Sequence, residues 1–318
     1  MTNSSDASLG DLGEFGLVEA LAELFEQGEH VVLGPGDDAA VVAVPDGRVL
    51  VSTDLHVDGR HFRRDWASAV EIGHRVAAAN LSDLNAMGGR ATAVTVGLAA
   101  PADLPVAWAL DLARGVAAEC ALVGASVVGG DVTAADQVVI AVTALGAAPR
   151  PVRRSGARPG DQVAIAGRQG WAAAGLSVLA RGFRSPRVLV DAYRRPEPPY
   201  GAGREAAELG ATALIDVSDG LLADVGHIAA ASRVGVRIHS ERLAVAEPLR
   251  AVGAALGADP LQFVLTGGDD HPLVATFPSG TDLPEQWVRI GEVVQGDGVT
   301  VDDAAYDGPA GHAHFRGP

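Results

Sequence analysis

The stretch 214–224 reads Leu-Ile-Asp-Val-Ser-Asp-Gly-Leu-Leu-Ala-Asp and places three carboxylates among apolar residues. Its first residues are typical of the end of a buried strand, and its apolar residues then recur at helical spacing. Ser218 or Asp219 is a suitable N-cap for that helix. The stretch therefore predicts a strand that ends where a helix begins, with Asp216, Asp219 and Asp224 at the edge of a core.

Ionised carboxylates beside apolar surface are costly unless they are paired. No arginine occurs between Arg204 and Arg233, so apart from His227 the nearest basic side chains are distant from these acids in the sequence. A bound cation is then the natural partner. A second interpretation stays open at this point, in which Asp219 only caps the helix and the other two carboxylates face water.

A chain of 318 residues, 48% of them hydrophobic, has room for two domains and a sizeable core. Its 40 glycines and its 4% of aromatic residues are typical of an α/β protein with many tight turns. The net charge of −16 argues against a nucleic-acid groove, which needs a basic face. That charge fits acidic groups that bind metal ions, and part of it serves solubility.

Every basic side chain in the sequence except histidine is arginine, because the chain contains no lysine. This absence excludes a P-loop lysine, the strand lysine of protein kinases and a Schiff-base lysine. A nucleotide would have to be bound by another design.

The single cysteine, Cys120, lies in an alanine-rich helical pattern and cannot form an internal disulfide. We expect it to be a small buried residue. Residues 1–13 are polar and acidic without a signal-peptide pattern, and no apolar run reaches membrane-spanning length. The expectation is a cytoplasmic protein with a loosely attached N-terminus.

A change of composition over residues 146–160, which are rich in proline, glycine and arginine, predicts a domain boundary. We expect a first domain at 1–148 and a second at 149–318. In the first, periodicity predicts helices at 17–25, 68–87 and 104–122, strands at 91–98, 125–128 and 138–145, and a hairpin of strands 39–44 and 49–53 joined at Asp46-Gly47. In the second, it predicts strands at 162–166, 234–239 and 273–277, helices at 171–181 and 202–209, and a final hairpin of 288–294 with 299–302.

Six short motifs share one chemistry, although each alone is an ordinary turn sequence. Mg²⁺ prefers oxygen ligands and is typically shared between carboxylates and substrate phosphates, and glycines let phosphate oxygens approach backbone N–H groups. Taken together, the six motifs suit phosphoryl transfer, because that reaction needs positioning and charge stabilisation more than covalent chemistry. The motifs are Gly36-Asp37-Asp38, Ser52-Thr53-Asp54, Asn80-Leu81-Ser82-Asp83, Gly129-Gly130-Asp131, Asp216-Val217-Ser218-Asp219-Gly220 and Gly267-Gly268-Asp269-Asp270.

The local sequence context refines the prediction for three of these acids. Asp83 lies in the middle of an apolar helical pattern, so we expect it to point into a polar site. Asp131 follows a predicted strand, and ligand sites in α/β sheets usually lie just beyond strand ends. Strand alternation puts Asp38 on the face of Ala40 and leaves Asp37 as a turn residue.

In order and spacing the six motifs resemble those of the thiamine-monophosphate kinase family, in the superfamily named after aminoimidazole ribonucleotide synthetase. The resemblance extends from Gly13-Glu14-Phe15 to the segment 311–315. It implies a two-domain α/β fold with mixed sheets, whose N-terminal sheets pair in a homodimer and whose C-terminal α/β domain closes over the nucleotide. It also implies ATP-dependent phosphorylation of thiamine monophosphate to thiamine diphosphate by direct in-line transfer with several Mg²⁺ ions. Nucleic acid and membrane are not expected partners.

Carried over by position, the resemblance implies three sets of site residues. The acceptor phosphate is already ionised near neutral pH, so no side-chain base is expected. The implied magnesium ligands are Asp38, Ser52, Thr53, Asp54, Asp83, Asp131, Asp216 and Asp219. The implied nucleotide contacts are Gly130, Asp131, Arg154 and Ser218, and the implied thiamine-phosphate contacts are His61, Asp269 and His312.

The chain departs from the family in two of these places. Where the family has Gly-Gly-Glu-Asp-Tyr, this sequence has Gly-Gly-Asp-Asp-His at 267–271, so Asp269 is one methylene shorter. The tail aromatic expected against the substrate is His312. From the residues alone, His61 is equally an ordinary loop histidine and Arg154 a solvated linker arginine.

Other members of the superfamily are the nearest alternatives. A selenophosphate synthetase would show a reactive cysteine or selenocysteine with a lysine near the N-terminus, and a hydrogenase-maturation dehydratase a C-terminal cysteine; this sequence has neither. The ribonucleotide cyclo-ligase matches the six motifs less well. An alternative from another class is a non-catalytic protein whose acidic loops bind Ca²⁺. Such sites concentrate their ligands in one contiguous loop, whereas these acids extend from Asp38 to Asp269.

Overall fold

The computed structural model describes residues 8–34, 40–44 and 47–312. The chain divides into two compact units, one of residues 1–84 with 90–149 and one of residues 85–89 with 150–318. The division after Pro149 lies within the segment rich in proline, glycine and arginine. The assignment of residues 85–89 to the second unit has no signal in the composition.

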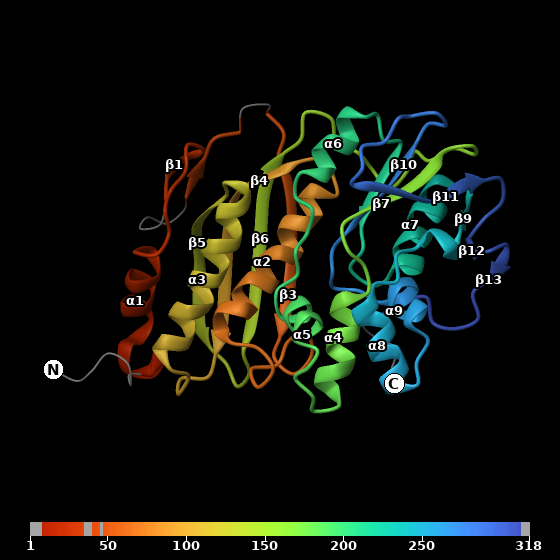
Figure 1. Ribbon diagram of the computed structural model, residues 1–318. Coiled ribbons are helices and arrows are strands. Elements are labelled where there is room, and N and C mark those ends of the chain that lie inside the picture. Colours follow the sequence, from red (N-terminus) through yellow and green to blue (C-terminus); the bar gives the residue numbers. More distant parts are fainter. Residues whose placement is uncertain (1–7, 35–39, 45–46, 313–318) are drawn as a thin grey trace. The chain divides into compact units, whose positions relative to one another are not determined.

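The first unit is built on a four-stranded sheet of order β3-β6-β4-β5. Strand β6 is antiparallel to both of its neighbours, and β4 and β5 are parallel. Parallel neighbours need a crossover connection, and α3 provides it. Figure 1 shows α2 and α3 along one face of this sheet. The bounds are β3 Leu50–Val57, β4 Arg90–Ala100, β5 Ser126–Ala134, β6 Val139–Ala147, α2 Ala69–Asn85 and α3 Val106–Val123.

The N-terminal helix α1 (Leu9–Ala22) begins earlier than its apolar periodicity predicts. Ser8 caps it, because its hydroxyl accepts the N–H of Asp11 while the Asp11 carboxylate accepts the N–H of Ser8. This Ser-x-x-Asp capping box is visible in the sequence, so the expectation of a loose N-terminus is wrong from Ser8 onward.

The predicted hairpin of strands 39–44 and 49–53 does not form. Strand β2 (Val41–Val42) pairs instead with β1 (Val31–Leu33), and β3 pairs with β6 along its whole length. An eight-residue strand satisfies far more of its backbone groups against β6 than against a two-residue partner.

Helices α2 and α3 cross at backbone contact. A Cβ atom on Gly115 would lie 2.1 Å from the carbonyl oxygen of Val70, and one on Gly73 would lie 2.2 Å from that of Leu112. Beside this crossing, Nδ1 of His74 lies 2.8 Å from a carboxylate oxygen of Glu119, and both side chains are buried. The crossing fixes α2, which carries the Asn80-Leu81-Ser82-Asp83 motif.

The second unit contains a seven-stranded sheet of order β13-β12-β9-β11-β7-β10-β8. The predicted final hairpin is wrong, because β9 lies between β11 and β12, antiparallel to the first and parallel to the second. The predicted strands at 162–166 and 273–277 are β7 and β10 with the expected bounds. The strands are β7 Gln162–Ala166, β8 Ala213–Asp216, β9 Gly235–Ile238, β10 Leu273–Phe277, β11 Trp287–Val294, β12 Val299–Val301 and β13 Ala304–Ala305.

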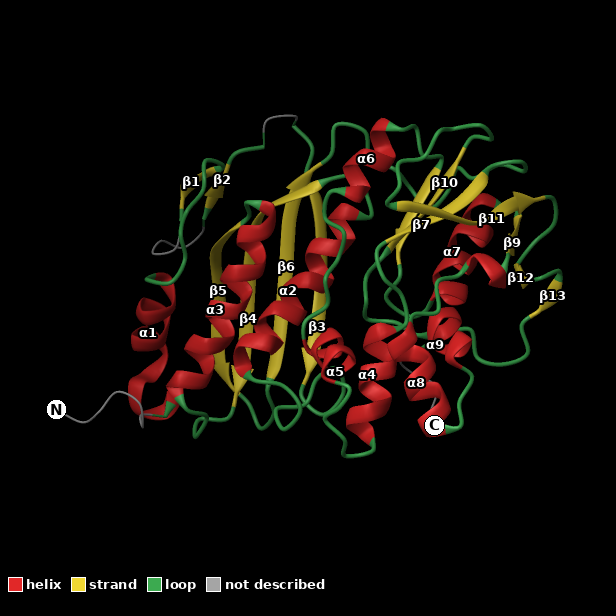
Figure 2. Cartoon of the chain, viewed as in Figure 1, coloured by secondary structure: helices red, strands yellow, loops and turns green. Residues whose placement is uncertain are grey.

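Helices of the second unit pack around this sheet, and α4, α8 and α9 lie together (Figure 2). Part of the core lies between the sheet and α6, where the rings of Phe277 and Trp287 meet edge to face at 5.3 Å. The helices α5, α8 and α9 are absent from the sequence-based expectations. The bounds are α4 Trp171–Ala180, α5 Arg187–Arg194, α6 Ala202–Glu208, α7 Leu221–Ser232, α8 Glu247–Leu256 and α9 Pro260–Thr266, with a 3₁₀ turn at Ser240–Arg242.

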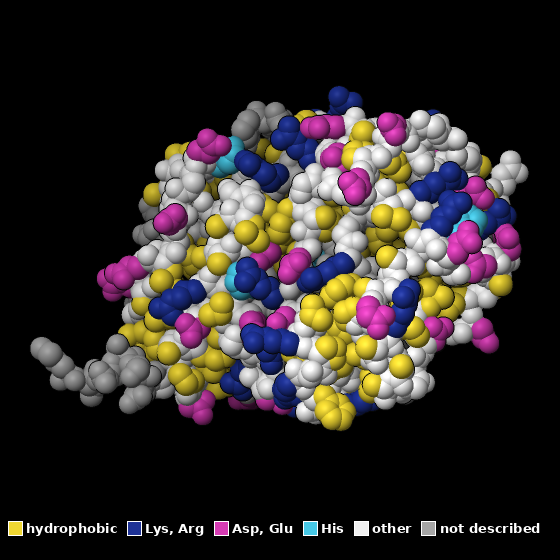
Figure 3. Space-filling view, in the orientation of Figure 1, with side chains coloured by type: hydrophobic (Ala, Val, Ile, Leu, Met, Phe, Trp, Pro, Cys, Tyr) yellow, Lys and Arg dark blue, Asp and Glu magenta, His cyan; other side chains and the backbone are white. Residues whose placement is uncertain are grey.

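Within the described ranges, no helix is both long enough and apolar enough to cross a membrane. On the face shown in Figure 3, arginines alternate with acidic side chains and form no continuous basic surface.

Candidate active site

In the first unit, two of the six motifs interlock. Alternation along β3 puts Ser52 and Asp54 on the face that α2 covers, and a spacing of three puts Asn80 and Asp83 on one face of α2. The Ser52 hydroxyl donates to Oδ2 of Asp83, and Nδ2 of Asn80 donates to Oδ2 of Asp54 at 2.7 Å. Four oxygen-bearing side chains from a strand and a helix therefore share one place.

Thr53 and Asp131 lie on the opposite face of the same sheet. Cross-strand register puts Asp54 in one row of the sheet and Asp131 in the next. The row of Asp54 contains Val142, Val96 and Gly130, and the row of Asp131 contains Gly97, Ala141 and Leu55. Thr53 is one residue out of phase with Asp54, and its hydroxyl lies 2.9 Å from that of Thr143. Residues in neighbouring rows point to opposite faces.

The position of Asp131 corrects a prediction. Strand β5 continues to Ala134, so Asp131 lies within the strand and not beyond its end. β5 and β3 are the two edges of the sheet, three inter-strand spacings apart, or roughly 14 Å. A single copy of the first unit thus separates Asp131 from Asp54 both by face and by distance. Gly130 lies on the side of Asp54, and a Cβ there would be 1.9 Å from the Val96 carbonyl oxygen, so the strand requires glycine.

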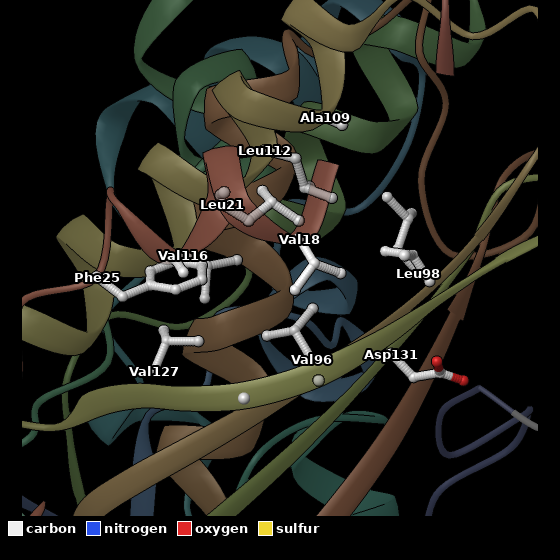
Figure 4. Close-up of a pocket in the computed structure, with 15 residues that line it drawn as sticks. Val18, Leu21, Phe25, Val96, Leu98, Ala109, Leu112, Val116, Val127 and Asp131 are labelled. Carbon is white, nitrogen blue, oxygen red and sulfur yellow. The ribbon is translucent and has the colours of Figure 1, made fainter. Parts of the chain in front are cut away.

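An apolar pocket lies on the helix-covered side, among α1, α3, β4 and β5. Figure 4 shows side chains such as Val18, Leu112 and Val96 gathered there, while the carboxylate of Asp131 points away from them. Asp131 is the one charged residue in the described lining, and the direction of its carboxylate agrees with its position on the other face.

In the second unit, the loop between β8 and α7 is organised by Asp224. One of its carboxylate oxygens, Oδ2, accepts the backbone N–H groups of Ser218 at 3.1 Å, Asp219 at 3.0 Å and Gly220 at 3.1 Å. The helix begins at Leu221 without a side-chain cap, so the prediction of Ser218 or Asp219 as its N-cap is wrong. The reason is that the carboxylate of Asp224, in the first turn of the helix, accepts the N–H groups of the loop. Neither Ser218 nor Asp219 is then needed as a side-chain cap.

Asp224 is a site residue that the sequence reasoning left out. It is buried, and burial raises its pKa to about 7, with a smaller contribution from the charges of Asp216 and Asp219. The backbone N–H groups of Gly220 and Asp219 act in the opposite direction and lower this pKa. The only signal in the sequence was its place as the third acid of the stretch 214–224.

The Gly-Gly-Asp-Asp-His segment lies along this same loop. The N–H of Asp269 donates to the carbonyl of Ser218 at 3.0 Å, and the N–H of Val217 donates to that of Pro272 at 2.9 Å. A Cβ on Gly268 would lie 2.0 Å from the Ser218 carbonyl oxygen, so the close approach needs glycine. Two motifs some fifty residues apart are thereby brought side by side, as expected for parts of one site.

The side chains of this segment alternate in their roles. Asp270 turns inward, where its Oδ1 accepts the N–H of Ala172 at 3.0 Å in the first turn of α4. Burial raises the pKa of Asp270 to about 7. Nδ1 of His271 lies 3.1 Å from Oδ2 of Asp216, and both residues are buried. Asp269 has a left-handed backbone with φ of 70°.

Three further predicted contacts are placed as follows. The backbone N–H of His312 donates to the Asp219 carbonyl at 2.9 Å, so the C-terminal segment reaches the β8–α7 loop. Arg154 has an exposed side chain, and its carbonyl accepts the Ser232 hydroxyl. His61 lies in the first unit, where Nδ1 accepts the N–H of Val57 at 3.0 Å. Asp38 lies outside the described residues.

No group of three or more His, Cys, Asp or Glu side chains in the described part of the chain is close enough to hold a metal ion by itself. The donor sets nevertheless fit Mg²⁺. They are carboxylate, hydroxyl and amide oxygens without sulfur, and Mg²⁺ usually takes only one or two carboxylates, the rest of its shell coming from water and phosphate. Asp54 with Asp83 in the first unit and Asp216 with Asp219 in the second are two such pairs.

Comparison with known proteins shows the family to which the chain belongs. The family model for the AIR synthase related protein, N-terminal domain, matches residues 36–148, and that for the C-terminal domain matches residues 158–304. The thiamine-monophosphate kinase of Mycobacterium tuberculosis is 45% identical over 317 residues, which cover 98% of this chain and 94% of that protein. That of Corynebacterium glutamicum is 38% identical over 309 residues, 93% of this chain and 91% of that protein.

Among solved structures, AaThiL complexed with AMPPCP and TMP is similar to this chain with a TM-score of 0.81 and 32% identity, covering 97% of this chain and 99% of that one. The chain therefore belongs to the AIR synthase related family and, within it, to the thiamine-monophosphate kinases.

Proposed function

We propose that the chain transfers the γ-phosphoryl group of ATP directly to thiamine monophosphate, in line and with the help of Mg²⁺, to form thiamine diphosphate. The observation that carries the proposal is the interlocked set of oxygen-bearing side chains on β3 and α2. Support comes from AaThiL, a relative whose structure was solved with AMPPCP and TMP. The identity of 45% to a thiamine-monophosphate kinase favours this activity over the cyclo-ligase alternative.

The residues that would hold Mg²⁺ are Asp54 and Asp83 in the first unit and Asp216 and Asp219 in the second. Bound there, the metal would neutralise the charge that develops on the phosphoryl oxygens. Because the chain has no lysine, phosphate charge would be neutralised by metal ions bound to carboxylates and by arginine. Arg154 is our candidate for the arginine that contacts a nucleotide phosphate.

The remaining candidate residues would orient the nucleotide and the thiamine phosphate. Ser218 and Asp219 stand in a loop whose backbone is held by Asp224, so their side chains keep a fixed direction. Asp269 is held beside them by its bond to Ser218 and is our candidate for the thiamine-phosphate contact, with His61 and His312. The acceptor phosphate is ionised near neutral pH, so no general base is required.

We further propose that the first units of two copies pair through the face of the sheet that carries Thr53 and Asp131. That face exposes Val51 by 58% and Leu55 by 61%, which is unusual for large apolar side chains on a sheet. Pairing would place Asp131 in the interface, together with Thr53, the predicted ligand that lies on the same face.

The test of the proposed function is phosphoryl transfer from ATP with Mg²⁺, with thiamine monophosphate and free thiamine as parallel acceptors and thiamine diphosphate followed by chromatography. Product from the monophosphate alone supports the proposal. If neither acceptor gives product although ATP binds, the kinase activity is refuted and the cyclo-ligase reaction is tested next.

The metal proposal is tested separately by Asp83→Asn, which keeps the size of the side chain and removes its charge. Loss of one ligand of the phosphate-bound metal predicts a fall in turnover of at least about a hundredfold, since such electrostatic contacts contribute several kcal/mol in the transition state. Asp131→Asn tests the predicted ligand on the opposite face of the sheet, which should show the same fall if it binds the metal. Near-normal turnover in either folded variant would contradict the assignment, and Asp297→Asn, an exposed acid of the second unit, is the control.

A further inference from the structure

His271 is the residue at which this chain departs most in chemistry from the Gly-Gly-Glu-Asp-Tyr pattern, because an imidazole replaces a phenol. Its Nδ1 lies 3.1 Å from Oδ2 of Asp216, one of the proposed metal ligands. Both side chains are at least nine-tenths buried. A buried contact of this kind is stronger than one in water because little solvent competes for it.

The backbone holds His271 at this place. Leu273 is the register partner of Asp216, and Pro272 accepts the N–H of Val217, so the segment runs directly along the end of β8. His271 itself has a left-handed backbone with φ of 53°, a conformation that L-residues seldom adopt. Backbone strain of this kind persists where the surrounding structure holds it, and it often occurs at functional sites.

The direction of the hydrogen bond follows from its partners. An ionised carboxylate can only accept, so Nδ1 of His271 carries the proton and donates to Oδ2 of Asp216. Among the described residues, Oδ1 of Asp216 takes no hydrogen bond. One oxygen is thus fixed by the histidine and the other is left for a ligand.

We propose that His271 is a positioning residue for Asp216: its Nδ1–H group fixes Oδ2, orients Oδ1 toward the metal and thereby sets the affinity of the Asp216–Asp219 pair for Mg²⁺. The inference rests on the proposed function, because it needs Asp216 to be a ligand. Outer hydrogen bonds to metal ligands typically account for a factor of 10–100 in metal affinity.

The test uses two amides that differ only in reach. In His271→Asn the side-chain N–H stands close to the position of Nδ1, whereas in His271→Gln it lies one methylene further out. We expect the dissociation constant for Mn²⁺, measured on the full chain with AMPPCP by the spin resonance of the free ion, to change less than about threefold in the Asn variant. We expect it to rise at least about tenfold in the Gln variant.

His227→Gln, at an exposed position on α7, is the matched control and should bind Mn²⁺ as the wild type does. Steady-state kinetics add a second measurement. The Mg²⁺ concentration for half-maximal turnover should rise in His271→Gln, while the KM for thiamine monophosphate stays within about twofold.

Equal Mn²⁺ affinity of the Asn and Gln variants, whether both match the wild type or both are weakened alike, would overturn the role of His271. Failure of the proposed function is distinguishable, because then the wild type itself would bind no Mn²⁺ with AMPPCP or would transfer phosphate without a divalent ion.

Discussion

At the scale of residues, acids that look alike in the sequence have different roles in the structure. Asp224 and Asp270 are buried and accept backbone N–H groups, at the start of α7 and in the first turn of α4 respectively. Asp54 and Asp83 are half-buried and accept hydrogen bonds from polar side chains between β3 and α2. Burial and hydrogen-bond partners, rather than residue type, separate anchoring acids from ligand candidates.

The raised pKa of Asp270 makes a prediction about stability. Its carboxyl has a pKa of 3.8 when exposed to water and of about 7 in the folded chain, because burial disfavours the charge. Between those values the folded chain holds a proton that the unfolded chain has lost. This group's contribution to the free energy of unfolding therefore falls as the pH rises from about 4 to 7, and is constant above that range.

Asp270→Asn removes this titration while it keeps an acceptor for the N–H of Ala172. Relative to the wild type, the variant should gain stability as the pH rises from 5 to 7.5, by on the order of 2–3 kcal/mol. Urea midpoints measured at both pH values test this. A difference between variant and wild type that stays constant with pH would contradict it.

At the scale of elements, the position of the β3–α2 site depends on how closely α2 approaches α3. The two helices touch at Gly73 and Gly115, where any side chain would overlap a carbonyl oxygen of the facing helix. Helical periodicity predicts both helices but does not reveal this crossing, because a glycine inside a helix is otherwise only unfavourable.

Gly115→Ala should destabilise the chain by about 1–3 kcal/mol, since its Cβ would lie 2.1 Å from the Val70 carbonyl oxygen and force α2 and α3 apart. The matched change is Gly226→Ala within α7, where no atom lies within 4 Å of the new Cβ. That variant should be more stable than the wild type by about 0.5–1 kcal/mol, because alanine favours the helix. Thermal unfolding of both variants measures the contrast, and equal effects at the two positions would refute the crossing.

At the scale of the whole molecule, the predicted ligands are distributed over both compact units, and the proposed pairing needs a second copy. Asp54 and Asp83 belong to the first unit, and Asp216 and Asp219 to the second. Asp131 lies on the face of the sheet that exposes Val51 and Leu55. The assembly therefore bears directly on whether the predicted ligands can act together.

Leu55→Asp should abolish the proposed dimer, because it places a charge in an apolar interface. Light scattering after size-exclusion chromatography should show a dimer for the wild type and a monomer for the variant. Val288→Asp, at a valine of β11 that is 46% exposed, is the control and should remain dimeric. If Leu55→Asp is a dimer like the wild type, the copies pair through another surface. If the wild type is itself a monomer, the copies do not pair.

The amino-acid sequence by itself determined the family, the segments that carry chemistry and most elements of regular structure. The six motifs have an order and spacing that few families share, and strong local periodicity predicted α2, α3, β7 and β10 closely. These properties are local, so they can be read from consecutive residues. The missed helices α5, α8 and α9 are short, and their boundaries depend on packing.

Only the tertiary structure decided which strands pair, on which face Asp131 lies and what Asp224 and His271 do. Alternation assigns faces within one strand, but the register between strands depends on backbone hydrogen bonds between distant residues. For the same reason no local pattern shows that Asp224 holds the Ser218–Asp219 loop or that His271 reaches Asp216. These contacts form only when the chain folds, because they join residues that the sequence separates.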